Sequence, residues 1–146
     1  MQRFARPARL AAIGAATALL SASLASAGDA SPGPTGVWRN PKNSVHVRID
    51  SCGQAMCGTV VWASPKAQAD AKKGGTDKLV GLQLLRNFTP VKPGLWRGKV
   101  FVPDLNGTFS GTAELVDANT LKARGCLFVG IACKTQLWKK VDSEAD

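Results

Sequence analysis

The stretch "SCGQAMCGTVVW", Ser51 to Trp62, decides how this chain is expected to fold. It places Cys52 and Cys57 five positions apart, and a glycine follows each cysteine. The preceding run "SVHVRID" alternates apolar and polar residues, which is typical of a half-buried strand. The run "CGTVVWA" is rich in strand-forming residues. The two runs therefore predict a β-hairpin whose turn, around "GQAM", lies between the two cysteines.

The same pattern of short strands and turn signals continues along the chain. About eight runs at spacings near ten residues are expected as strands, which predicts an antiparallel barrel or sandwich. They are 36–40, 44–50, 57–63, a part of 79–91, 95–104, 107–116, 120–129 and 134–141.

One segment departs from this pattern and predicts a short helix near residues 65–73. Ser64 is a suitable N-cap and Pro65 suits the first helical position. Lys66 and Asp70 are spaced for an ion pair on one helix face, and Gly74-Gly75 supplies the stop. The helix carries alanines rather than large apolar residues, so we expect a surface connection in preference to a lid over one barrel end.

The chain begins with the pattern of a cleavable export signal. Three arginines and no acid precede the apolar, alanine-rich run "LAAIGAATALLSASLA", and small residues follow. This layout is that of a secretory signal peptide, cut after about Ala27. We therefore expect a periplasmic or secreted protein with no transmembrane segment in its mature form. The expected organisation is a signal peptide (1–27), a flexible leader (28–35), one β-barrel domain (36–141) and a tail (142–146).

The four cysteines favour disulfides over other cysteine chemistry. An even count in an exported chain is typical of disulfide bonds, the spacings suit a zinc site poorly, and no C-x-x-C redox pair occurs. Four cysteines allow three pairings. Because each pair flanks an expected hairpin turn, we predict the bridges Cys52–Cys57 and Cys126–Cys133.

The first and last strands carry a tryptophan pattern. Gly36-Val37-Trp38 opens the first strand, and Trp138-Lys139-Lys140 lies on the last. In a closed barrel these strands are neighbours, so Trp38 would close one barrel end beneath a cation such as Lys140. Trp138 is expected to have a structural role beside them. A G-x-W opening with a basic residue near the end is similar to lipocalins.

A more specific resemblance covers residues 36–141. The "CG…CG" pair, "WRGKVFVPDLNGTFSG" and the final "TQLW" resemble a family of exported bacterial proteins known as domain of unknown function 2147. The resemblance implies an eight-stranded, up-and-down, lipocalin-like or fatty-acid-binding-like barrel. It implies no reaction, because no biochemical activity is assigned to the family.

No catalytic constellation is recognisable in the sequence, so we expect a protein that is not an enzyme and needs no metal or cofactor. His46 is the single histidine and falls on the polar face of its strand. No G-x-S-x-G nucleophile motif or phosphate-binding glycine loop occurs. A zinc enzyme would need about three good ligands, which one histidine and paired cysteines do not supply.

Two functions from different classes follow. The first is a binding module that holds a small apolar or amphipathic ligand in the barrel mouth, with Trp62, Trp96 and Phe101 as candidate lining residues. The second is a structural or interaction protein of the cell envelope with a filled barrel. Without residues 1–27, 16 Lys and Arg face 10 Asp and Glu, a net charge of about +6. That excess favours an anionic envelope component as partner; no nucleic-acid partner is expected.

Overall fold

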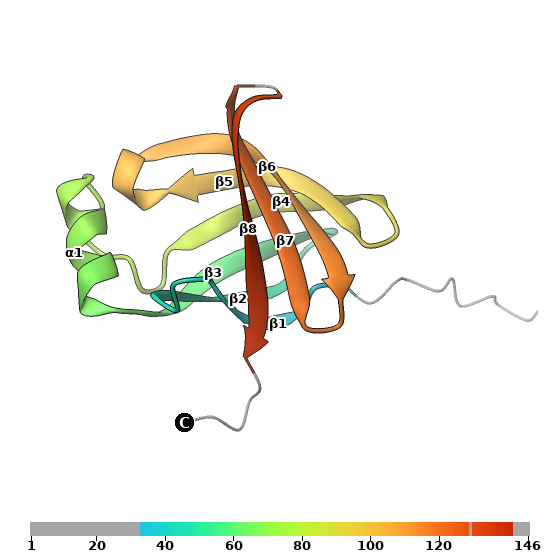
Figure 1. The fold of residues 1–146 in the computed structure, drawn as a ribbon, viewed down its shortest axis with the longest axis horizontal. Helices are drawn as coiled ribbons and strands as arrows, with labels where there is room; N and C mark the ends of the chain where they lie inside the picture. Colours follow the sequence, from blue (N-terminus) through green and yellow to red (C-terminus); the bar gives the residue numbers. More distant parts are fainter. Residues whose placement is uncertain (1–32, 129, 142–146) are drawn as a thin grey trace, which may run out of the picture.

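The structure is a computed structural model, and it describes residues 33–128 and 130–141. Its eight strands form a closed antiparallel barrel in which each strand pairs with its sequence neighbours and β8 pairs with β1 (Figure 1). The predicted fold class is confirmed. The strands are β1 (Gly36–Arg39), β2 (Val45–Cys52), β3 (Ala55–Ala63), β4 (Gln83–Lys92), β5 (Leu95–Val102), β6 (Gly107–Asp117), β7 (Thr120–Phe128) and β8 (Ile131–Val141).

The β2–β3 hairpin has the alternation that its sequence predicts. Val47 and Ile49 are buried, while Arg48 and Asp50 are exposed. The turn is shorter than expected, because Ala55 and Met56 already belong to β3 and pair with Cys52 and Ser51. Only Gly53 and Gln54 remain between the strands, and Gly53 has the positive φ of 69° that a two-residue hairpin turn requires.

The strand expected within 79–91 begins later than its apolar residues do. β4 starts at Gln83, and residues 79–82 form a loop folded against β3. In this loop Gly81 has a φ of 90°, and its amide donates to the carbonyl oxygen of Val60. Leu79 is buried in the core from that loop. An apolar run here therefore marks core residues rather than one continuous strand.

The barrel closes where β1 meets β8. Trp38 faces Lys140 across this pair, and the Lys140 ammonium lies 5.6 Å from the centre of the Trp38 ring. The Trp38 side chain is fully buried, and its Nε1 donates to the carbonyl oxygen of Pro34 at 2.8 Å. Trp138 lies on β8, two residues before Lys140, and faces Leu121 of β7. The first and last strands are thus joined around a buried tryptophan.

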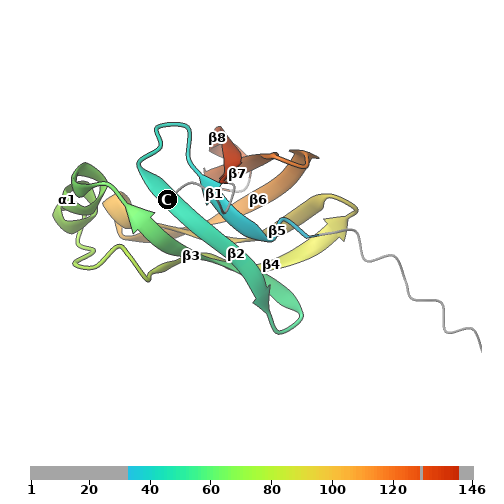
Figure 2. The ribbon, with the colours of Figure 1, turned by 90° about the horizontal axis from the view of Figure 1, so that it is seen from below.

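The helix α1 (Pro65–Lys73) lies at one end of the barrel, beside the connection between β5 and β6 (Figures 1 and 2). The Ser64 hydroxyl accepts from the Ala67 amide, and Lys66 and Asp70 form an ion pair at 2.6 Å. Ala71 is fully buried, and α1 contacts the short 3-10 helix η1 (Pro103–Leu105). The helix therefore connects β3 to β4 and also packs on a neighbouring connection.

The barrel interior is filled by apolar side chains. Gly98 on β5 has no room for a side chain, since a Cβ there would lie 2.5 Å from Phe88 Cδ2. At Gly111 a Cβ would lie 2.5 Å from Val100 Cγ2. These glycines therefore admit the large side chains of neighbouring strands into the centre rather than leaving an open cavity. The buried core comprises Trp38, Val47, Ile49, Met56, Val60, Ala63, Ala71, Leu79, Leu84, Phe88, Trp96, Ala113 and Leu121.

Candidate functional site

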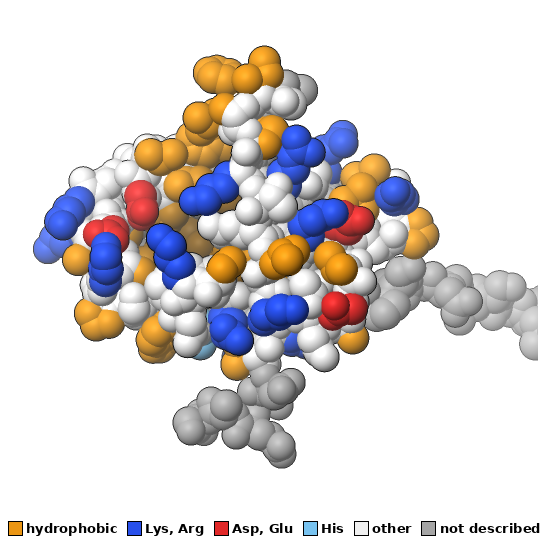
Figure 3. All heavy atoms as spheres, viewed as in Figure 1, with side chains coloured by type: hydrophobic (Ala, Val, Ile, Leu, Met, Phe, Trp, Pro, Cys, Tyr) orange, Lys and Arg blue, Asp and Glu red, His pale blue; other side chains and the backbone are white. Residues whose placement is uncertain are grey.

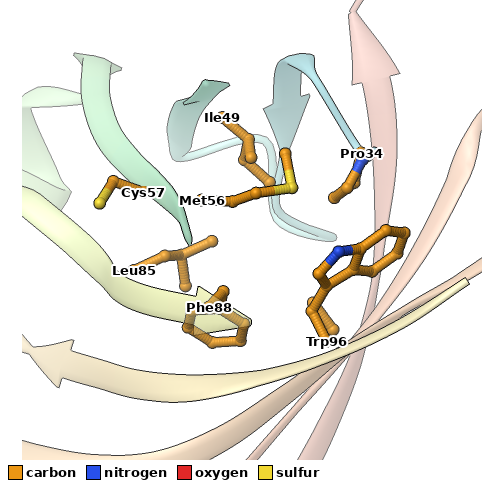
Figure 4. Close-up of a pocket in the computed structure, with 8 residues that line it drawn as sticks. Pro34, Ile49, Met56, Cys57, Leu85, Phe88 and Trp96 are labelled. Atoms are coloured by element: carbon orange, nitrogen blue, oxygen red, sulfur yellow. The ribbon is translucent and has the colours of Figure 1, made fainter. Parts of the chain in front are cut away.

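The barrel interior contains a small apolar cavity of about 10 Å³. This volume is about the minimum needed to hold one water molecule. Figure 4 shows Met56, Phe88 and Trp96 directed toward its centre, with Pro34 beside Trp96. In this conformation the cavity is too small for an organic ligand. Its lining is Pro34, Ile49, Met56, Cys57, Leu85, Phe88, Trp96 and Ala113.

A much larger open groove, of about 440 Å³, adjoins this cavity on its outer side. It runs between the β2–β3 turn and the β4–β5 turn, at the end of the barrel opposite α1 (Figures 1 and 2). Its volume is within the range of known small-molecule sites, about 300–1,000 Å³. The groove is lined by Gly33, Ser51, Gly53, Gln54, Ala55, Met56, Pro90, Val91, Lys92, Pro93, Gly94 and Trp96.

Local sequence shapes both walls of the groove. On one side the Cys52–Cys57 disulfide closes the β2–β3 hairpin next to its tight turn. On the other side Gly94 has a φ of 78° and its carbonyl oxygen accepts from the Leu115 amide. The pairing of β4 with β5 is irregular between Pro90 and Lys92, which leaves Val91 half-exposed in the groove. A proline and an irregular register are typical of a strand end that leaves the regular ladder.

Met56 and Trp96 line both the groove and the internal cavity. They are the partition between the two spaces. A methionine side chain is unbranched and flexible, so it changes rotamer at low cost. Met56 is therefore the more easily displaced of the two side chains that separate the groove from the cavity.

The structure brings one of the three predicted lining residues to this site. Trp96 lies at the groove floor and is buried. The prediction for Trp62 is wrong for the conformation seen here, because this side chain is 43 % exposed and lies on the outer face against His46. Val61 forms a bulge between the pairs His46–Trp62 and Val47–Val60, and the extra residue turns Trp62 outward.

Phe101 also lies outside both spaces. Trp96, Gly98 and Val100 point inward along β5, so strand alternation directs Phe101 to the outer side. There it is half-buried and still packs against the buried core, and the Arg86 guanidinium lies 4.9 Å from its ring centre. Met56, in contrast, was missed because the sequence placed it in the turn. A two-residue turn at Gly53-Gln54 would have indicated that Met56 already belongs to the next strand.

Both predicted cysteine pairs are bonded. Cys52 joins Cys57 and Cys126 joins Cys133, and each bridge ties a hairpin near its turn. The described residues include no free cysteine. The sulfurs are therefore structural here.

The charges near the groove are sparse. Among the described residues that line it, Lys92 is the charged one, and it is exposed. His46 lies away from the groove on the outer face, where its Nε2 is 2.7 Å from Asn43 Oδ1. Partial burial, and secondarily the charge of Arg39, lower the pKa of His46 below its usual value. Within residues 33–128 and 130–141, no three His, Cys, Asp or Glu side chains gather as a metal site would require.

Comparison with known proteins gives a fold neighbour. The solved structure of protein HP1028 from Helicobacter pylori, described as belonging to the lipocalin family, superposes with a TM-score of 0.61 at 15% sequence identity. The match covers 75% of this chain and 84% of that chain. At this identity the likeness concerns the fold, which is lipocalin-like. In the part of the chain that the structure describes, no helix is long and apolar enough to span a membrane.

Sequence comparison places the chain more specifically. No curated protein sequence matches it significantly. The model of one family matches residues 36–140, which is nearly the whole barrel. The chain therefore belongs to the domain of unknown function 2147 family, described as an uncharacterized protein conserved in bacteria.

Proposed function

We propose that this protein is a non-enzymatic binding module that takes a small apolar or amphipathic ligand into the groove above Met56 and Trp96. The observation that carries the proposal is the placement of these two side chains between an open groove of about 440 Å³ and the apolar cavity beneath it. Concave, mostly apolar sites with a few polar groups are typical of small-ligand binding.

The polar residues at the groove favour an amphipathic ligand with an anionic head. Lys92 lies on the β4 wall, and Ser51 and Gln54 lie on the opposite wall. An apolar tail would replace Met56 in its present position and contact Trp96, while the head would remain at the rim beside Lys92. A fatty carboxylate has this combination of parts.

We also propose that the protein works outside the cytoplasm. Two disulfides within a chain of this size are typical of an oxidising compartment. The expected signal peptide, residues 1–27, lies outside the described residues. Cell fractionation with mass determination of the purified protein would test both the compartment and the cleavage site.

Tryptophan fluorescence can test the groove directly. We expect titration with dodecanoate to change the emission of the wild-type protein, and Trp96→Phe to remove most of that change. Trp62→Phe is the matched control, because Trp62 is on the outer face, and it should keep the response. Lys92→Gln should weaken dodecanoate binding but leave dodecanol binding almost unchanged.

Native mass spectrometry of protein purified from its own host provides the second test. A co-purifying small molecule that is lost in the bulky variant Met56→Trp would support the groove. In the fluorescence titration, a response to dodecanoate that persists in Trp96→Phe would contradict the proposal. So would a ligand-free mass together with no response to fatty acids or alcohols, and the filled-barrel interaction protein would then be the better explanation.

A further inference from the structure

The β7–β8 hairpin ends in exposed apolar side chains. Leu127, Phe128 and Ile131 are 49%, 69% and 66% exposed, respectively, and we refer to these three residues as the hairpin tip. Figure 3 shows apolar side chains gathered on the projection at the top of the view, where Figure 1 places the end of this hairpin. Large apolar residues grouped on a projection are a common mark of an interaction surface.

The hairpin tip does not serve the barrel core. Below it, a Cβ built on Gly125 would meet no atom within 4 Å, so the hairpin here has left the packed interior. The Cys126–Cys133 disulfide nevertheless ties the two strands together, and Phe128 pairs with Ile131 above the bridge. A projection that is held in shape presents its apolar side chains at little cost in conformational entropy.

The hairpin behind the tip is uniformly basic. Residues 120–141 contain five Lys and Arg and no Asp or Glu. Lys122 is paired with Glu114 of β6, and Lys139 donates to the Thr120 hydroxyl. Arg124 and Lys134 lie nearest to the tip, since Lys134 faces Gly125 across the strand pair and Arg124 faces Thr135. The remaining cation of this hairpin is Lys140.

An apolar projection with two cations behind it, Arg124 and Lys134, matches the layered chemistry of a phospholipid surface. Apolar side chains enter the boundary between headgroups and acyl chains, and cations remain at the level of anionic headgroups. A second copy of this chain is a poorer partner, because two such hairpins would bring like charges together. We propose that the hairpin tip docks the protein on a bilayer that contains anionic phospholipid.

Vesicle sedimentation tests this proposal. The chain without residues 1–27 is the right material, because it keeps the complete barrel and lacks an apolar stretch that would bind lipid by itself. We expect binding to vesicles of phosphatidylglycerol and phosphatidylcholine, and much weaker binding to phosphatidylcholine alone. Phe128→Ser should weaken binding about tenfold or more. The pair Arg124→Gln and Lys134→Gln should weaken it about thirtyfold at low salt.

Val116→Ser is the matched control, because Val116 is 57% exposed on β6 away from the hairpin tip. It should bind vesicles like the wild type. A Phe128→Trp variant should gain emission that bromine-labelled lipid quenches. Dodecanoate binding should remain unchanged in Phe128→Ser, which separates this proposal from the one for the groove.

Three results would overturn the proposal. The first is equal binding of Phe128→Ser and wild type to anionic vesicles, and the second is equal binding of the wild type to zwitterionic and anionic vesicles. The third is absence of vesicle binding together with a concentration-dependent dimer, in analytical ultracentrifugation, that Phe128→Ser abolishes. That result would identify the tip as a contact between copies of this chain.

Discussion

The β2–β3 and β7–β8 hairpins of this barrel each carry one disulfide, but their surroundings differ. In β2–β3 the strands beside the bridge turn their side chains into the core, and Ile49, Met56 and Val60 are all buried. In β7–β8 the strand ends beside the bridge extend past the packed interior, and Phe128 and Ile131 are exposed. A cysteine pair thus holds a hairpin's register without indicating whether its apolar residues belong to the core.

The largest difference between the hairpins should appear when the same residue type is truncated in each. Ile49→Ala should lower the free energy of unfolding by about 2–5 kcal/mol, because Ile49 is 2% exposed and its removal leaves a cavity. Ile131→Ala should change it by no more than about 0.5 kcal/mol, because Ile131 is already largely in solvent. Urea unfolding of both variants measures the contrast; similar losses would mean that the second hairpin packs on the core after all.

Removing the disulfides one at a time should cost similar stability but have different functional effects. The closed loops are short and nearly equal in length, so each Cys-to-Ser pair should lose about 2 kcal/mol. Cys52→Ser with Cys57→Ser should also weaken dodecanoate binding, because that bridge lies beside the groove. Cys126→Ser with Cys133→Ser should weaken vesicle binding and spare dodecanoate binding. Thermal unfolding and the two binding assays check this, and the opposite pattern would reverse the assignment of the hairpins.

Replacing one glycine of each hairpin by alanine should give a smaller difference in stability between the two hairpins. At Gly58 a new Cβ would lie 2.8 Å from Leu85 Cδ1 and 2.9 Å from Val47 Cγ1, so Gly58→Ala should destabilise by about 1–2 kcal/mol. Gly125→Ala meets nothing within 4 Å. It should be neutral, or stabilise by about 0.5 kcal/mol through the unfolded state. The midpoints of chemical denaturation measure both changes, and a destabilised Gly125→Ala would show that this part of the hairpin is packed.

The smallest expected effect is a pH dependence confined to the first hairpin. Partial burial and Arg39 lower the folded-state pKa of His46, so the native state binds this proton less readily than the unfolded chain does. Stability should therefore fall as the pH decreases from about 6.5, the usual histidine value, through the lower native pKa. His46→Gln should flatten this dependence. Thermal unfolding between pH 7 and pH 5 measures how stability changes with pH. If this change is the same in His46→Gln as in the wild type, the pH dependence comes from other groups.

Much of the fold was predictable because its signals are local. Alternation marked β2 and β6, Ser64 and Pro65 marked the start of α1, and the cysteine spacing marked two hairpins. The start of β4 was less predictable, because Leu79 and Leu82 are as apolar as strand residues. Their place in a loop depends on Gly81 and on its hydrogen bond to β3.

The candidate site was predicted only through Trp96. Trp62 would face inward if β3 alternated strictly from Val60, and the bulge at Val61 reverses that face. Such a bulge arises from the pairing of two strands, so one strand's sequence does not reveal it. The groove itself was not predictable. It lies between the β2–β3 turn and the β4–β5 turn, which are about 40 residues apart in sequence, and the closed barrel sets the distance between them.

The amino-acid sequence was thus sufficient for the all-β class, the helix and the choice of cysteine partners, since each depends on contacts between residues close along the chain. The up-and-down strand order was implied by the family resemblance, because closure of the barrel pairs β1 with the distant β8. The closed barrel decided which faces are inside, that the interior is filled, and where an open groove and an apolar projection remain. Those properties depend on the coiling and register of all eight strands together. Side-chain alternation divides a strand into two faces, and only the packing of neighbouring strands determines which of them is buried.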